Sequence, residues 1–197
     1  MGFDFLLQQT SFAEAFFAVE QNHVDWNSLK FADSLFNLFG CSFEGMVLGA
    51  SRVWDERRLD LSLISIPNLV ANFADQSYLG CHGLRSGRED RAQFDALYYN
   101  PIRSRLRVAR TELLAHCVIL GRSRDRYASD IIGLREFKLV NADVLSFCRE
   151  TLDLLYSLNR QLHIGSWRED SSLEKMKREA AGSHIALLNV LLQSTPT

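Results

Sequence analysis

The sequence has few of the residues that form turns, with three prolines and 11 glycines among 197 residues. An all-β sandwich needs many turns, so this shortage disfavours that class. Charged residues make up 23% of the chain and hydrophobic residues 47%, which are ordinary globular values and argue against disorder. The length suits one domain with a sizeable core.

Long apolar runs are also lacking, because no stretch of 18 apolar residues occurs, and we expect no transmembrane helix. The N-terminus MGFDFLLQQT contains an acid, Asp4, and no basic residue, unlike the start of a signal peptide. The cysteines lie far apart and form no Cys-x-x-Cys motif, which favours free, buried thiols: Cys41, Cys81, Cys117 and Cys148. Together these features predict a cytoplasmic protein.

The usual metal and nucleotide motifs are missing too. The adjacent pair His116-Cys117 matches no zinc module. A di-metal carboxylate bundle needs Glu-x-x-His motifs, and Glu112 stands one residue too far from His116. Neither a P-loop nor a dinucleotide-binding glycine fingerprint occurs. We therefore expect no metal and no cofactor.

Hydrophobic residues recur every three or four positions over most of the chain, which predicts an all-α fold: a single up-and-down bundle of six or seven helices. One predicted helix opens at Ser11, and another ends at Gly40. Asn100-Pro101 should break or restart a helix, and a long helix should run from Ile102 to about Leu120. The segment Asp60–Ile66 alternates like a strand but is too short to build a sheet.

Two further helical features bear on packing. Small residues around Gly45 and Gly49 should let another helix approach closely. The last predicted helix runs from Leu173 to Leu192 and should place one apolar face inward. That face comprises Leu173, Met176, Ala180, His184, Leu187 and Leu191.

Charge is distributed unevenly along the chain. The net charge of −2 does not predict a nucleic-acid-binding protein. Residues 103–126, however, contain seven arginines and only two acids, Glu112 and Asp125, and so carry a local charge of +5. Such a segment is typical either of a phosphate-binding patch or of a solvated helix face.

An arginine and a histidine stand six residues apart in the string RVARTELLAHCVIL, at Arg110 and His116. Such a pair can cleave RNA without a metal: the histidine transfers a proton, the arginine stabilises charge on the phosphate, and the ribose 2′-hydroxyl attacks. The spacing itself is not specific, since Arg178 and His184 repeat it. Arg110 could instead form a salt bridge with a neighbouring helix, and His116 could be a core histidine.

Three stretches together resemble the HEPN superfamily, and within it the AbiU2-like proteins of bacterial abortive infection systems. They are Val47–Asp55 (VLGASRVWD), Leu61–Leu69 (LSLISIPNL) and Arg110–His116. The resemblance covers residues 10–160 of the single domain 1–197 and leaves residues 171–193 as an additional C-terminal helix. Trp54 and Asp55 are interpreted as structural, with Trp54 in the core and Asp55 at a helix end.

The resemblance implies a metal-independent endoribonuclease or RNA-binding protein of a phage-defence or toxin–antitoxin system. Arg110 and His116 would then be catalytic, and Glu112 would orient the imidazole. Arg103, Arg105 and Arg107 would hold the RNA backbone. Thr111 and Cys117 depart from residues common in active members. They favour the alternative, an inactive dimerisation or interaction module that binds a protein partner such as a nucleotidyltransferase or an antitoxin.

Helix geometry bears on how such a site would assemble. At 100° per residue, Arg110 and His116 lie about 120° apart, on opposite borders of an apolar ridge. That ridge comprises Leu106, Ala109, Leu113, Cys117 and Leu120. If two copies packed through the ridge, Arg110 of one chain could approach His116 of the other. This geometry agrees with the homodimer that the resemblance implies.

Overall fold

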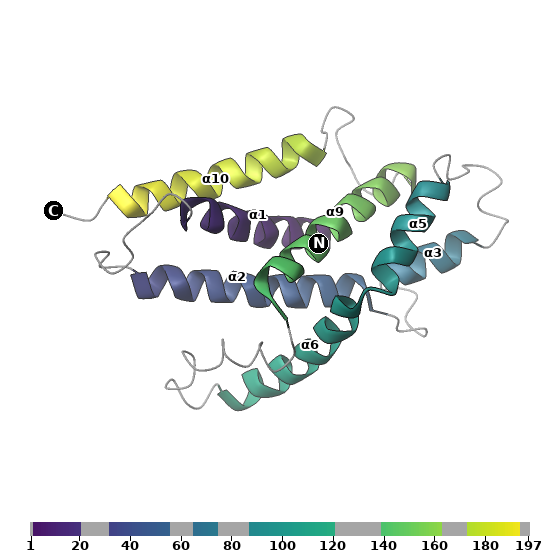
Figure 1. The fold of residues 1–197 in the computed structure, drawn as a ribbon, viewed down its shortest axis with the longest axis horizontal. Coiled ribbons are helices and arrows are strands. Elements are labelled where there is room, and N and C mark those ends of the chain that lie inside the picture. The colour runs from purple at the N-terminus through teal and green to yellow at the C-terminus, as the bar shows by residue number, and fades with distance from the viewer. Residues whose placement is uncertain are drawn as a thin grey trace.

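The computed structural model describes residues 2–20, 32–55, 65–74, 87–120, 139–162 and 173–193. Within these ranges the chain forms helices and no strands, which confirms the all-α class (Figure 1). The helices are α1 (Gly2–Glu20), α2 (Ala32–Val53), α3 (Ile66–Ala74), α5 (Gly87–Tyr98), α6 (Pro101–Leu120), α9 (Asn141–Leu162) and α10 (Leu173–Gln193).

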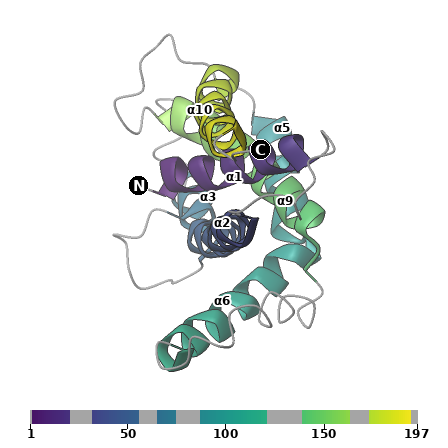
Figure 2. The ribbon, with the colours of Figure 1, turned by 90° about the vertical axis from the view of Figure 1, so that its left-hand side faces the viewer.

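Helix α1 is at the centre of the bundle. It packs between α2 and α10, and α9 crosses this row of three helices (Figures 1 and 2). Helix α6 follows α5, packs on α2 and α9, and then extends away from the body, as the end-on view in Figure 2 shows. This arrangement places the N-terminal half of α6 against the core.

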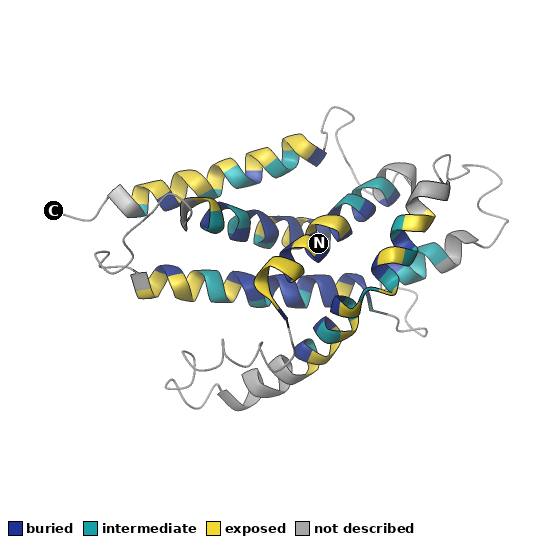
Figure 3. Cartoon of the chain, viewed as in Figure 1, coloured by how far each residue is buried: buried dark blue, intermediate teal, exposed yellow. Residues whose placement is uncertain are grey.

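The buried residues lie on the faces that the helices turn toward one another (Figure 3), and most of these residues are hydrophobic. The main core draws on every helix of the described part, and its fully buried members include Leu6, Met46, Leu106 and Phe147. A smaller cluster joins α1, α2 and α10 through Ala15, Phe16, Leu35 and Leu188. Helix α10 contributes to both clusters, since Leu173 and Ala180 belong to the main one.

Close packing of α1 on α2 depends on glycines, as their positions in the sequence predict. A Cβ atom on Gly45 would lie 2.8 Å from the side chain of Gln9. One on Gly49 would lie 3.3 Å from Leu6 and Phe5. The two helices therefore approach closely because α2 presents hydrogen atoms rather than side chains there.

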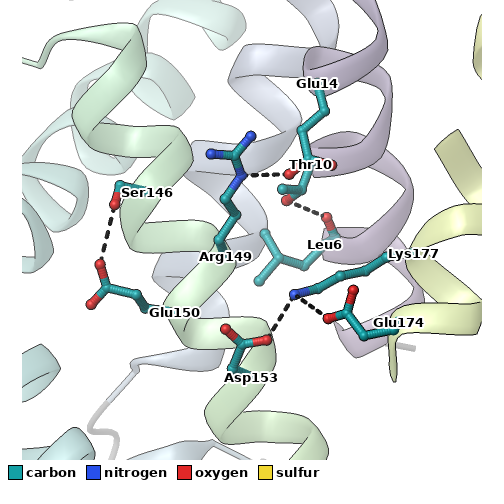
Figure 4. Close-up of polar contacts among 9 residues, drawn as sticks. All are labelled: Leu6, Thr10, Glu14, Ser146, Arg149, Glu150, Asp153, Glu174 and Lys177. Atoms are coloured by element: carbon teal, nitrogen blue, oxygen red, sulfur yellow. Dashed lines mark hydrogen bonds and ion pairs between the residues drawn. The ribbon is translucent and has the colours of Figure 1, made fainter. Parts of the chain in front are cut away.

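Polar contacts tie α9 to its neighbours at the surface (Figure 4). Arg149 of α9 forms an ion pair with Glu14 of α1. Lys177 of α10 contacts Asp153 of α9 at 2.7 Å. These pairs are partly exposed, so each contributes little to stability.

Three local predictions are wrong. Helix α1 begins at Gly2 instead of Ser11, which is buried inside the helix. Helix α2 runs unbroken through Gly40, because tertiary packing on both sides outweighs the roughly 1 kcal/mol that glycine costs within a helix. On α10 the inward leucine is Leu188, which is 1% exposed, whereas Leu187 is 49% exposed.

The strand-like segment falls mostly outside the described residues. Its last residue, Ile66, opens α3. The hydroxyl of Ser65 accepts a hydrogen bond from the backbone N–H of Asn68 at 3.4 Å, and Pro67 occupies the first turn. This end of the segment is therefore a helix start with a serine cap.

Candidate functional site: the arginine face of helix α6

Helix α6 starts at a capped corner. The side chain of Asn100 accepts a hydrogen bond from the N–H of Ile102 at 2.9 Å, and Pro101 supplies the first helical residue. The preceding helix closes with a bond from the N–H of Tyr99 to the carbonyl of Asp95. The corner predicted at Asn100-Pro101 is confirmed, and it fixes the direction in which α6 leaves α5.

The inner side of α6 belongs to the core of its own chain. Leu106 and Ala109 are 1% and 0% exposed. The hydroxyl of Ser51 on α2 lies 3.1 Å from the carbonyl oxygen of Leu106, so the backbones of α2 and α6 are close. The prediction that this part of the ridge meets a second copy is therefore wrong, because α2 and α9 already cover it. The side chains of Leu113, Cys117 and Leu120 lie outside the described residues.

Arg110 forms an ion pair with Asp55, the second residue beyond the end of α2. Its Nη1 donates to Asp55 Oδ2 at 3.0 Å. The two side chains are only 20% and 18% exposed. The salt bridge to a neighbouring helix that the sequence left open as an alternative is thus present, and it joins two of the stretches that carry the family resemblance.

Asp55 is held in place by its neighbour Trp54. The Trp54 indole is 4% exposed, and its Nε1–H donates to the hydroxyl of Thr151 on α9 at 3.1 Å. Trp54 is therefore a core residue, as predicted, and Asp55 does lie at a helix end. The carboxylate that meets Arg110 is anchored through α2 to the centre of the bundle.

Arg103 contributes to the fold of the corner. Its Nη1 donates to the carbonyl oxygen of Tyr98 at 2.9 Å. Its guanidinium lies 4.0 Å from the centre of the Tyr98 ring and 5.7 Å from that of Trp54. These are cation–π contacts, which stabilise a partly buried arginine.

The other predicted backbone-binding arginines differ in position. Arg107 is exposed, and Arg105 is half-buried. Arg103, Arg107 and Arg110 are spaced i, i+4 and i+7, so they share one face of α6. Arg105 lies on another side of the helix. We call the row of Arg103, Arg107 and Arg110 the arginine face.

His116 and Glu112 belong to α6, whose backbone is helical to Leu120, but their side chains lie outside the described residues. Six residues of helix separate Arg110 from His116, which corresponds to a rise of about 9 Å and a rotation of about 120°. Both could act on one phosphate only if another part of a chain completed the site.

The second arginine–histidine pair has a structural setting. His184 Nε2 lies 3.1 Å from Gln8 Oε1, and the imidazole packs edge-on against Phe12. Burial lowers the pKa of His184, and a hydrogen bond with the backbone of Gln8 opposes this shift. Arg178 is exposed on the same helix. Interpreting this pair as a chance repeat of the spacing fits these contacts.

Sequence reasoning missed the aromatic group at the corner. Tyr98 and Tyr99 meet edge-to-face at 5.1 Å between ring centres, and Tyr98 stacks on Phe94 at 5.4 Å. Arg91 lies over the Phe94 ring at 5.5 Å. The sequence shows two adjacent tyrosines before Asn100-Pro101. Only the fold shows that the Arg103 guanidinium lies over the ring of Tyr98.

Within the described residues, no three histidine, cysteine, aspartate or glutamate side chains gather as a metal site. No helix there is long and apolar enough to span a membrane. Cys41 and Cys148 are free thiols, as predicted, but only Cys148 is buried and Cys41 is exposed. Comparison of the chain with protein-family models, curated proteins and solved structures gave no match.

Proposed function

We propose that this protein is a HEPN-type, metal-independent endoribonuclease or RNA-binding protein of a bacterial phage-defence or toxin–antitoxin system. One observation carries the proposal: the Arg110–Asp55 ion pair joins the Val47–Asp55 and Arg110–His116 stretches that resemble this superfamily. The arginine face also supports this proposal. Residues 96–111 contain no aspartate or glutamate, so this segment of the chain has no negative charge of its own to offset the arginines.

In this proposal Asp55 is a positioning residue for Arg110. A guanidinium has five N–H donors, and Asp55 accepts from Nη1. The ion pair restrains the Arg110 guanidinium. The remaining N–H donors of this guanidinium contact a phosphate of the RNA and stabilise the negative charge that develops on it. The ribose 2′-hydroxyl loses its proton and attacks the phosphorus, the bond from phosphorus to the 5′-oxygen breaks, and the leaving 5′-oxygen takes up a proton. His116 either accepts the first of these protons as a base or donates the second as an acid. Glu112 orients the imidazole.

The site is completed by a second copy of the chain. Arg110 and His116 of one straight helix diverge, and the homodimer supplies the missing partner. Because Leu106 and Ala109 are buried within one chain, the second copy must contact α6 beyond Ala109.

Substitution of the two histidines tests the proposal. His116→Ala should abolish cleavage of RNA, whereas His184→Gln should leave cleavage intact, although both positions follow an arginine at the same spacing. The dimer should persist in both variants, as measured by light scattering. Equal cleavage by the wild type and His116→Ala would exclude His116 as the proton-transfer group.

A second candidate is an inactive interaction module that binds a protein partner such as a nucleotidyltransferase or an antitoxin. It is favoured by Thr111 and Cys117, which depart from residues common in active members, and by the use of Arg103 in a contact within its own chain. It predicts that the wild type cleaves no RNA and forms a stable complex with the protein encoded beside it in a pull-down from co-expression.

A further inference from the structure

The corner between α5 and α6 presents an unusual aromatic side chain. Tyr99 is 78% exposed, the largest exposed fraction among the large hydrophobic side chains of the described residues. Its neighbour Tyr98 is partly buried and contacts both Phe94 and the Arg103 guanidinium. Tyr99 leans edge-on against Tyr98, so an exposed ring stands on a packed base.

The backbone at this point is restrained. The N–H of Tyr99 bonds to Asp95, the N–H of Asn100 bonds to Leu97, and Asn100 caps the next helix. Proline follows directly and fixes its own φ. A ring on such a corner loses little conformational freedom when a ligand covers it, which favours binding.

The arginine face begins at Arg103, whose guanidinium lies over the ring of Tyr98, the residue before Tyr99. Arg103, Arg107 and Arg110 follow one another along α6 over a rise of about 10 Å. Within this face Arg110 is in an ion pair with Asp55, and Arg107 is exposed. A chain that carries both flat bases and phosphates matches this order of an exposed ring followed by guanidinium groups.

We infer that Tyr99 stacks on an unpaired base of single-stranded RNA whose backbone follows the arginine face from the α5–α6 corner to Arg110. This inference rests on the proposed function and adds a binding residue, Tyr99, which requires a single strand because a base in a duplex has no free face for the ring. Tyr99 acts in binding, ahead of the step at Arg110.

The test measures binding of a fluorescent 2′-O-methyl oligo(A) of about 15 nucleotides, a length that matches single-strand binding sites. This oligonucleotide lacks the 2′-hydroxyl needed for cleavage, so the protein can bind it but cannot cut it. Tyr99→Ala should weaken binding about 5- to 150-fold, the loss typical of one stacked base. Tyr99→Phe should bind like the wild type. Val140→Ala, which alters another strongly exposed apolar side chain, should also bind like the wild type.

A backbone oligomer without bases separates stacking from charge. The wild type and Tyr99→Ala should bind this oligomer equally weakly. A general structural defect in Tyr99→Ala would instead weaken its binding to both oligomers. If Tyr99→Ala binds oligo(A) as tightly as the wild type, the stacking inference fails while the proposed function stands. If the wild type binds no single-stranded RNA, both fail. Tyr99-dependent binding of an acidic polypeptide in place of oligo(A) would assign the corner to a protein partner and overturn the inference.

Discussion

The ion pair between Arg110 and Asp55 should couple the two residues strongly in stability measurements. Exposed ion pairs contribute about 0.2–1 kcal/mol, whereas hydrogen bonds to charged groups contribute about 1.5–3 kcal/mol. About four-fifths of each side chain is removed from water, since the exposed fractions are 20% and 18%. We therefore expect a coupling free energy of about 1–2 kcal/mol, between these two cases.

A double-mutant cycle measures this coupling. Arg110→Ala, Asp55→Ala and the double variant are unfolded in urea, and the free energies of unfolding are compared with that of the wild type. The Arg91–Asp95 pair is the matched control, because it has the same ion types at 3.2 Å but side chains that are 58% and 42% exposed. Its coupling should be about 0.3–0.5 kcal/mol. Equal coupling in both pairs would refute the reasoning that burial makes Arg110 and Asp55 a fixed unit.

Three other changes should have defined effects. Gly182→Ala should raise the free energy of unfolding by about 0.5–1 kcal/mol, because an added Cβ meets nothing within 4 Å and alanine favours the helix; thermal denaturation checks this. Thr151→Val should lower it by about 1–3 kcal/mol in urea unfolding, since the buried Trp54 N–H loses its acceptor. Burial holds the pKa of folded His184 below its ordinary value of 6.5, so the unfolded chain binds the proton more readily. Stability should therefore fall as the pH drops below 6.5, and it should fall less steeply in His184→Gln; equal slopes for the two proteins would contradict this assignment.

The helical fold could be predicted from the sequence because each helix carries its own periodicity and boundary signals. Asn100-Pro101 is an example, since a cap and a proline act locally. Gly40 shows the limit of such signals. A glycine marks a helix end only when tertiary packing does not continue the helix, and Leu35 and Phe43 both pack against the rest of the bundle.

The candidate site was less predictable because it depends on contacts between distant parts of the chain. Periodicity shows that Leu106 and Ala109 face something apolar, but it does not distinguish the core of the same chain from a second copy. The partner of Arg110 is 55 residues away at Asp55. Arg103 and Arg107 are close together in the sequence, yet Arg103 packs on an aromatic ring and Arg107 is exposed. This difference depends on the α5–α6 corner, which places Tyr98 beside Arg103.

Cleavage of RNA in the presence of EDTA tests the central claim most directly. The wild-type protein should cut a single-stranded RNA without any divalent metal, and it should leave a 2′,3′-cyclic phosphate. A single 2′-deoxy substitution at the cut position should block the reaction, because the attacking hydroxyl is then missing. Failure to cut any RNA, a requirement for metal, or equal cleavage of the 2′-deoxy substrate would contradict the proposed chemistry.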